Sequence, residues 1–89
     1  MDELEQSFKN AVELINENKF KKKPEDEEQT TLYKYFKQAN IGDINISCPL
    51  LDVTGRAKWF AWNSVKGMSK KEAMEKYIEN VLILFEKYN

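Results

Sequence analysis

Apolar residues recur at intervals of three and four along four separate stretches of this 89-residue chain. That spacing matches the 3.6-residue turn of an α-helix, so each stretch has one apolar face. No stretch shows the strict alternation of apolar and polar residues that is typical of a strand. A chain of this length supports one modest core, in which amphipathic helices bury their faces against one another. The sequence therefore predicts an all-α fold, a four-helix bundle forming a single domain over residues 1–89.

Glycines, prolines and capping residues set the expected helix limits. We predict helices over about 2–16, from near Pro24 to Gly42, over roughly 56–66, and from Ser69 to the end of the chain. Gly42 has the freedom to adopt the left-handed conformation that ends a helix. Ser69 and Glu72 have the spacing of a capping box, in which each side chain binds a free backbone amide of the other residue.

The predicted core follows from the same spacing. The expected inward residues are Leu4, Phe8, Ala11, Val12 and Ile15 in the first helix; Leu32, Tyr35, Phe36 and Ala39 in the second; Ala57, Phe60, Ala61 and Val65 in the third; and Ala73, Tyr77, Val81, Leu84 and Tyr88 in the fourth. A long connection runs from Gly42 to about Gly55. We expect its apolar residues to be buried as well: Ile44, Ile46, Leu50 and Leu51.

Composition argues against several classes of function. The net charge of −1 disfavours a nucleic-acid partner, because binding to phosphate backbones needs a basic surplus. The chain has no histidine, and its one cysteine, Cys48, lacks the base that a thiol nucleophile needs. Its three glycines are too far apart to form a phosphate-binding loop. We therefore expect no catalytic residue, no metal site and no enzymatic activity.

The expected location is the cytoplasm. A single cysteine permits no disulfide within the chain, which fits a reducing compartment. The acidic start MDELEQSF lacks the basic and apolar regions of a signal peptide, and no apolar run reaches the length of a membrane span.

Two aromatic and basic clusters are candidates for binding. In YKYFKQAN (33–40), Tyr33 and Lys37 share a helix face that differs from the predicted core face. A ring beside a cation suits a ligand that has both a flat base and a phosphate. In RAKWFAW (56–62), Arg56 and Lys58 open a helix, where backbone amides also attract anions. The alternative in both cases is an aromatic core with solvated cations, and Tyr77 and the basic run 19–23 likewise have simple structural explanations.

Three motifs in order, LYKYFKQANIGDIN (32–45), GRAKWFAW (55–62) and GMSKKEAMEKYIENV (67–81), give the chain a specific resemblance. From about Leu4 to Tyr88 it resembles the acyl-CoA-binding protein family. The resemblance implies a four-helix bundle of that type, which binds medium- and long-chain fatty acyl-CoA and releases it unchanged. It also implies an intracellular carrier and pool former in lipid metabolism, with no other cofactor. The expected molecule is a monomer that makes transient contacts with acyl-CoA-using enzymes or membranes.

The resemblance also assigns residues. Those expected at the CoA head group are Asn16, Tyr33, Phe36, Lys37, Arg56, Lys58 and Tyr77, of which Arg56 is expected from its place at the start of a helix. Those expected at the acyl chain are Phe8, Val12, Thr30 and Leu32. Phe36 stands where the family usually has tyrosine, and Asn16 where many members have lysine. The basic run 19–23 either replaces that cation or is a solvated loop. Gln29 and Thr30 occupy usually apolar positions, which leaves the preferred chain length open.

Two other interpretations make different predictions. A small helical module that grips a partner peptide in an aromatic groove would not need acyl-CoA. An acyl-CoA hydrolase would turn the ligand over, but the sequence offers no nucleophile and base for it.

Overall fold

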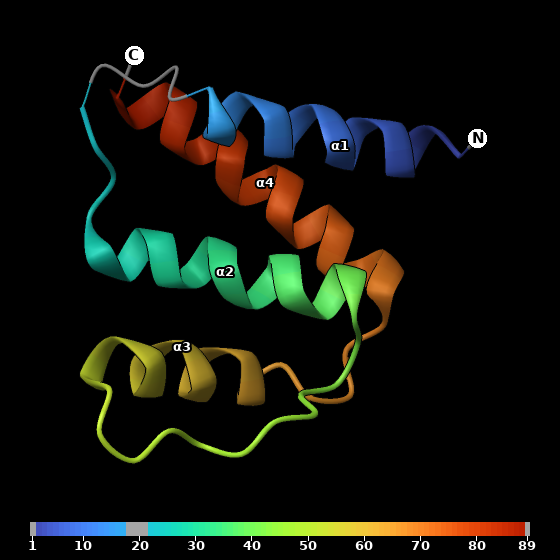
Figure 1. Ribbon diagram of the computed structural model, residues 1–89. Coiled ribbons are helices and arrows are strands. Elements are labelled where there is room, and N and C mark those ends of the chain that lie inside the picture. Colours follow the sequence, from blue (N-terminus) through green and yellow to red (C-terminus); the bar gives the residue numbers. More distant parts are fainter. Residues whose placement is uncertain (1, 18–21, 89) are drawn as a thin grey trace.

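The computed structural model describes residues 2–17 and 22–88, and within these residues it contains four α-helices and no strand. The helices are α1 (Glu3–Asn16), α2 (Asp26–Asn40), α3 (Val53–Asn63) and α4 (Lys70–Tyr88). α4 packs against both α1 and α2, while α3 packs against the opposite side of α2 and runs in the same direction as α2 (Figure 1). The predicted all-α four-helix bundle is confirmed. None of the described helices is both long enough and apolar enough to cross a membrane.

The main core lies where α1, α2 and α4 meet. Its buried residues are Phe8 and Ala11 from α1, Leu32 and Ala39 from α2, and Ala73, Tyr77, Val81 and Leu84 from α4. These residues were all expected to face inward from their helical spacing. The predicted faces of the first, second and fourth helices are therefore confirmed.

Side-chain caps begin α1 and α4. Asp2 Oδ1 accepts a hydrogen bond from the Leu4 amide at 2.9 Å, and Ser69 Oγ accepts one from the Glu72 amide at 3.0 Å. The second of these bonds is the serine half of the predicted capping box. Gly42 has a φ of +99°, the left-handed conformation expected for the residue that ends α2.

The third helix differs from its prediction in both limits and register. It begins at Val53 rather than near Arg56, because Asp52 precedes it and the Arg56 amide closes the first turn on the Asp52 carbonyl at 2.8 Å. Gly55 is therefore accommodated within the helix and does not delay its start. The buried residues near its end are Trp62 and Val65, whereas Ala57 and Phe60 are exposed, so their predicted burial was wrong.

The connection between α2 and α3 also differs from expectation. Ile44 is half-buried, but Ile46, Leu50 and Leu51 are exposed, the two leucines at 82% and 99%. The prediction assumed that the apolar side chains of this segment would hold it in place. Hydrogen bonds from α3 hold its backbone instead, so these side chains remain free to point into solvent.

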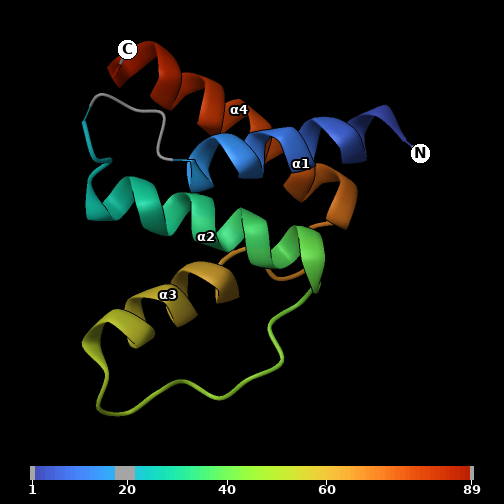
Figure 2. The ribbon, with the colours of Figure 1, turned by 45° about the horizontal axis from the view of Figure 1, so that its top comes forward.

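Three donors, one on each turn of α3, bind this connection along its length. Arg56 Nη1 donates to the Pro49 carbonyl at 3.1 Å, Trp59 Nε1 to the Ile46 carbonyl at 2.7 Å, and Trp62 Nε1 to the Gly42 carbonyl at 2.9 Å. The segment thus runs back beside α3, on the side away from α2, in the direction opposite to the helix (Figures 1 and 2). This return path explains why α2 and α3 are parallel.

A buried amide joins α2 to the connections before and after α3. Gln38 is fully buried, and its Nε2 donates to Asp43 Oδ1 at 2.9 Å and to the Met68 carbonyl at 2.8 Å. Asp43 Oδ1 also accepts from the Gly67 amide at 2.7 Å. The bonds from Gly67 and Gln38 hold the pKa of Asp43 below its ordinary value, because they favour the charged carboxylate.

A polar tie links the start of α2 to the end of α4. The Glu28 carboxylate accepts hydrogen bonds from the Tyr88 hydroxyl, from the Glu25 amide at 2.9 Å and from Lys87 Nζ at 2.9 Å. These bonds, the one from Tyr88 first, lower the pKa of Glu28 to about 2. The tie connects residues 59 and 60 positions apart in the sequence.

Candidate functional site

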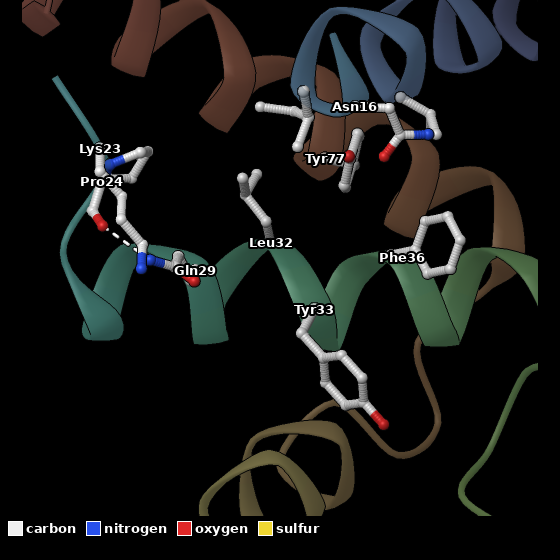
Figure 3. A pocket seen from close by; sticks show the side chains of 10 residues that line it. Asn16, Lys23, Pro24, Gln29, Leu32, Tyr33, Phe36 and Tyr77 are labelled. Atoms are coloured by element: carbon white, nitrogen blue, oxygen red, sulfur yellow. Dashed lines mark hydrogen bonds between the residues drawn. The ribbon is translucent and has the colours of Figure 1, made fainter. Parts of the chain in front are cut away.

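A pocket of about 410 Å³ lies between α1 and α2. It is lined by Val12, Ile15 and Asn16 from α1, Lys23 and Pro24 before α2, Gln29, Leu32, Tyr33 and Phe36 from α2, and Tyr77 from α4 (Figure 3). Within the described residues, the backbones of α1 and α2 each lie close to α4 but not to one another. The pocket occupies the space that this arrangement leaves.

The floor of the pocket is aromatic. The Tyr77 ring lies edge-on to the Phe8 ring, with centroids 5.1 Å apart, and 6.2 Å from the ring of Phe36. Tyr77 is buried, and burial raises the pKa of its phenol to about 12. The floor therefore stays uncharged at neutral pH and presents flat apolar surfaces.

One end of the pocket is polar. Gln29 Nε2 donates to the Pro24 carbonyl at 2.7 Å, which fixes the amide beside the Lys23 side chain (Figure 3). Asn16 is exposed and lines the pocket from the end of α1. Two uncharged amides, Asn16 and Gln29, and one lysine, Lys23, thus line an otherwise largely apolar cavity.

Two lysines lie at Tyr33, the lining residue that points from α2 toward α3 (Figure 3). Lys37 Nζ is 5.8 Å and Lys58 Nζ 5.3 Å from the centre of the Tyr33 ring, and Lys37 Nζ is also 5.6 Å from the Trp62 ring. Among the residues that the structure describes, neither ammonium has a carboxylate within ion-pair distance. The arrangement concentrates positive charge beside a ring, which suits an anion attached to a flat group.

The structure brings together most of the residues proposed for ligand contact. Asn16, Val12, Leu32, Tyr33, Phe36 and Tyr77 all line the pocket, and Lys37 and Lys58 meet at the ring of Tyr33. Phe8 lies in the core beneath it, against the rings of Tyr77 and Phe36.

Two proposed residues lie elsewhere. Thr30 is not among the lining residues, and its hydroxyl donates to the Asp26 carbonyl at 2.7 Å. The Arg56 side chain points to the connection before α3, where its Nη1 donates to the Pro49 carbonyl at 3.1 Å. In the basic run 19–23, residues 19–21 lie outside the described part of the chain, while Lys22 and Lys23 are exposed and Lys23 lines the pocket.

Sequence reasoning missed three lining positions. Ile15 was expected only as a core residue, although it is three positions after Val12 and adjacent to Asn16, which marks a shared face. Pro24 was considered only as a helix boundary, and Gln29 only as a departure from an apolar position.

Across residues 2–17 and 22–88, no three His, Cys, Asp or Glu side chains are grouped so that they could hold a metal ion.

Comparisons with known proteins show what the whole chain is similar to. The model of the family described as "Acyl CoA binding protein" matches residues 5–81. Acyl-CoA-Binding Protein 2 of Oryza sativa is 33% identical, with a TM-score of 0.84 over 94% of this chain and 92% of that one. ACBP from Moniliophthora perniciosa is 44% identical, with a TM-score of 0.82 over 98% and 83%. The acyl CoA binding protein of Babesia bovis is 32% identical, with a TM-score of 0.79 over 92% and 93%.

Proposed function

The chain belongs to the acyl-CoA-binding protein family, and on this premise we propose that it binds medium- and long-chain fatty acyl-CoA without altering it. The observation that carries the proposal is the pairing of Lys37 and Lys58 on the ring of Tyr33, at the side of an apolar pocket. Acyl-CoA combines a flat base, several phosphates and an apolar tail. The lysines are suited to its phosphates, and the aromatic floor is suited to its base or to apolar segments.

The expected energies divide between the two parts of the ligand. A hydrogen bond to a charged group contributes about 1.5–3 kcal/mol. Each buried methylene contributes about 0.8 kcal/mol, so a tail of about fourteen gives on the order of 10 kcal/mol before losses. Immobilising the ligand then costs several kcal/mol. Tail length should therefore decide affinity, and the lysines should decide which head group is accepted.

The finer role that we propose is that of a monomeric carrier. A protein that binds acyl-CoA without a nucleophile and base can hold its ligand and release it, but not hydrolyse it. Such a carrier would keep a pool of acyl-CoA available in the cytoplasm and pass it on through transient contacts. A single cysteine, Cys48, is consistent with a reducing compartment.

Titration calorimetry with a series of acyl-CoA chain lengths, free CoA and free fatty acid tests this function. We expect one long-chain acyl-CoA per chain, bound far more tightly than either CoA or the fatty acid alone. Recovery of intact thioester after prolonged incubation would support binding without turnover. Equal affinity for CoA with and without its tail would contradict the proposal.

A further inference from the structure

α3 and the connection before it stand apart from the main core. Within the described residues, the backbone of α3 lies close to that of α2 but not to α1 or α4 (Figure 1). The buried residues at its end, Trp62 and Val65, lie outside the core cluster that α1, α2 and α4 share. We call residues 43–66, which comprise the connection and α3, the α3 lobe.

Hydrogen bonds hold the α3 lobe together internally. Arg56 Nη1 binds the Pro49 carbonyl at 3.1 Å, and Trp59 Nε1 binds the Ile46 carbonyl at 2.7 Å. These bonds join the connection to the first and second turns of α3. We therefore expect the two segments to move together.

The two ends of the lobe meet at one point on α2. The fully buried Gln38 donates to Asp43 Oδ1 at 2.9 Å and to the Met68 carbonyl at 2.8 Å, and the Gly67 amide donates to Asp43 Oδ1 at 2.7 Å. Gly42 and Gly67 both have a positive φ, +99° and +93°, so the chain turns sharply where it enters the lobe and where it leaves it (Figure 2). The lobe is thus attached at a single polar junction.

Burial holds only the end of α3 that lies next to this junction. Trp62 is 1% and Val65 6% exposed, and Trp62 Nε1 donates to the Gly42 carbonyl at 2.9 Å. The first two turns of the helix, residues 53–60, contain no buried residue. Segments with few buried apolar contacts separate from a fold at low cost in free energy. The first two turns are therefore the part of α3 that can swing away from α2 most easily.

This unburied part of α3 carries one of the two lysines of the candidate site. Lys58 Nζ from α3 and Lys37 Nζ from α2 lie 5.3 Å and 5.8 Å from the centre of the same Tyr33 ring. No carboxylate among the described residues pairs with either ammonium, so two like charges approach where the lobe meets α2. A phosphate between them would replace this repulsion by an attraction to each lysine. Because it can contact both only when the lobe is closed, it would bind the closed arrangement more tightly than the open one.

We propose that the α3 lobe swings on the core about the junction at Gly42 and Gly67, and that a phosphate held jointly by Lys37 and Lys58 closes it. The structure shows the closed arrangement, in which Lys58 reaches Tyr33. Opening separates the two lysines, so it would set the rate at which a phosphate-bearing head group is released. The swing is a property of the fold. That the closing phosphate belongs to acyl-CoA rests on the proposed function.

Distances between pairs of spin labels measure the swing in the full chain. In a Cys48→Ser background, labels at Thr54→Cys and Glu75→Cys connect the first turn of α3 with an exposed position on α4. We expect a broad distribution of distances in the free protein and a narrow one with inorganic pyrophosphate, compared at equal ionic strength set by sodium chloride. If pyrophosphate binds only the closed lobe, the ratio of open to closed molecules should fall about elevenfold at ten times its Kd.

A second pair of labels tests where the hinge lies. Ser64→Cys, paired with the same Glu75→Cys, is exposed at the end of α3 that Trp62 anchors. Its distance distribution should be narrow with or without pyrophosphate. Equal widths for the two pairs in the free protein, or a Thr54 distribution that pyrophosphate leaves unchanged, would overturn the proposal.

Charge variants separate capture by the two lysines from a general ionic effect. Lys58→Gln should abolish the narrowing by pyrophosphate. Lys34→Gln removes the same charge from α2, where the Lys34 ammonium lies at the Tyr35 ring instead, and should preserve the narrowing. Narrowing that survived in Lys58→Gln, or that was lost equally in both variants, would exclude joint capture of the phosphate.

Acyl-CoA distinguishes the motion of the lobe from the proposed function. It should narrow the Thr54 distribution as pyrophosphate does. If pyrophosphate closes the lobe but acyl-CoA does not bind, the proposed function fails and the lobe proposal stands. If acyl-CoA binds but neither compound narrows the distribution, the lobe proposal fails and the proposed function stands.

Discussion

At the scale of a single residue, substitution of Lys37 distinguishes a role in ligand binding from a role in the stability of the fold. Its ammonium lies near the rings of Tyr33 and Trp62, and no carboxylate among the described residues pairs with it. Lys37→Ala should weaken acyl-CoA binding by about 1–3 kcal/mol, because a charged hydrogen bond to phosphate is lost. Unfolding free energy should fall by no more than about 1 kcal/mol, the value of an exposed cation–π contact. Calorimetry and denaturant unfolding measure the two effects.

Lys34 provides the matched control for this change. It lies on the same helix, with its ammonium 5.1 Å from the Tyr35 ring, but does not approach Tyr33. Lys34→Ala should reduce stability about as much as Lys37→Ala and leave affinity nearly unchanged. If both variants bound equally well, or if Lys37→Ala lost stability alone, the lysine would belong to the fold rather than to the site.

Asn16 tests whether the end of α1 reaches the phosphates. Because it is exposed and lines the pocket, Asn16→Lys should place a cation near the ligand. An exposed ion pair contributes only about 0–1 kcal/mol, so affinity should rise modestly, and more at low salt. Calorimetry at two ionic strengths measures the gain. If Lys23, which also lines the pocket, already supplies this charge, the gain should increase in a Lys23→Ala background.

Asn10→Lys adds the same charge to α1 at an exposed position outside the pocket lining. It should give no comparable gain. An equal effect of the two substitutions would indicate a general electrostatic attraction, and no effect of Asn16→Lys in either background would place the phosphates away from α1.

At the scale of elements, the sequence predicted the helices that depend on apolar periodicity. It did not predict the segments whose positions depend on hydrogen bonds between residues far apart in the chain. α1, α2 and α4 were predicted correctly, because each turns one apolar face to a shared core. α3 was not, because it has apolar residues on both its inner and outer sides: Trp62 is buried while Phe60 is exposed. The connection before it depends on side-chain donors reaching backbone carbonyls, as in Trp59 to Ile46, and no spacing rule reveals such partners.

The candidate site shows the same division. Tyr33 and Lys37 were identifiable as a pair because they are four apart on one helix. The approach of Lys58 to the same ring depends on the packing of α3 against α2, which only the fold provides. Family resemblance placed both Tyr33 and Lys58 at the CoA head group, but not their contact. Arg56 was expected there because it opens a helix beside Lys58, whereas in the structure it binds the Pro49 carbonyl.

The tie between α2 and α4 predicts a pH dependence of stability. Glu28 has a pKa of about 2 in the folded protein, below its ordinary value of 4.5, because Tyr88, Glu25 and Lys87 donate hydrogen bonds to its carboxylate. A lowered folded pKa means that the stabilisation is complete above pH 4.5 and is lost as the pH falls toward 2. Glu28→Gln should therefore lower the thermal midpoint at neutral pH, and the difference from the parent should shrink across that window.

Glu27→Gln, one residue earlier at an exposed position of the same helix, controls for the general effect of removing a carboxylate there. Its difference from the parent should change less with pH. Thermal midpoints recorded every half unit of pH would test this. If the thermal midpoint of Glu28→Gln ran parallel to that of the parent between pH 4.5 and 2, the hydrogen bonds to Glu28 would not be a source of acid sensitivity.

At the scale of the whole molecule, the pocket lies between α1 and α2, each of which packs closely against α4. Within the described residues the two backbones do not approach one another, and the helices meet through side chains such as the rings of Phe8 and Phe36, whose centroids are 6.3 Å apart. A ligand that fills the space between them would add contacts that the free protein lacks. Binding should therefore stabilise the whole fold and protect α1 in particular from hydrogen exchange.

The size of this effect can be predicted from mass action. Acyl-CoA at one hundred times its Kd should stabilise the folded state by about 2.7 kcal/mol, provided that it does not bind the unfolded chain. For a domain of this size, that corresponds to a rise in Tm of about 10–20 °C. Free CoA at the same concentration should give a much smaller rise, because it lacks the tail. Lys37→Ala should reduce the rise with acyl-CoA, whereas Leu50→Ser/Leu51→Ser should preserve it, since these exposed leucines of the connection before α3 do not line the pocket. Equal shifts with CoA and acyl-CoA, or ligand-induced protection in α3 without any in α1, would place the binding site away from the pocket between α1 and α2.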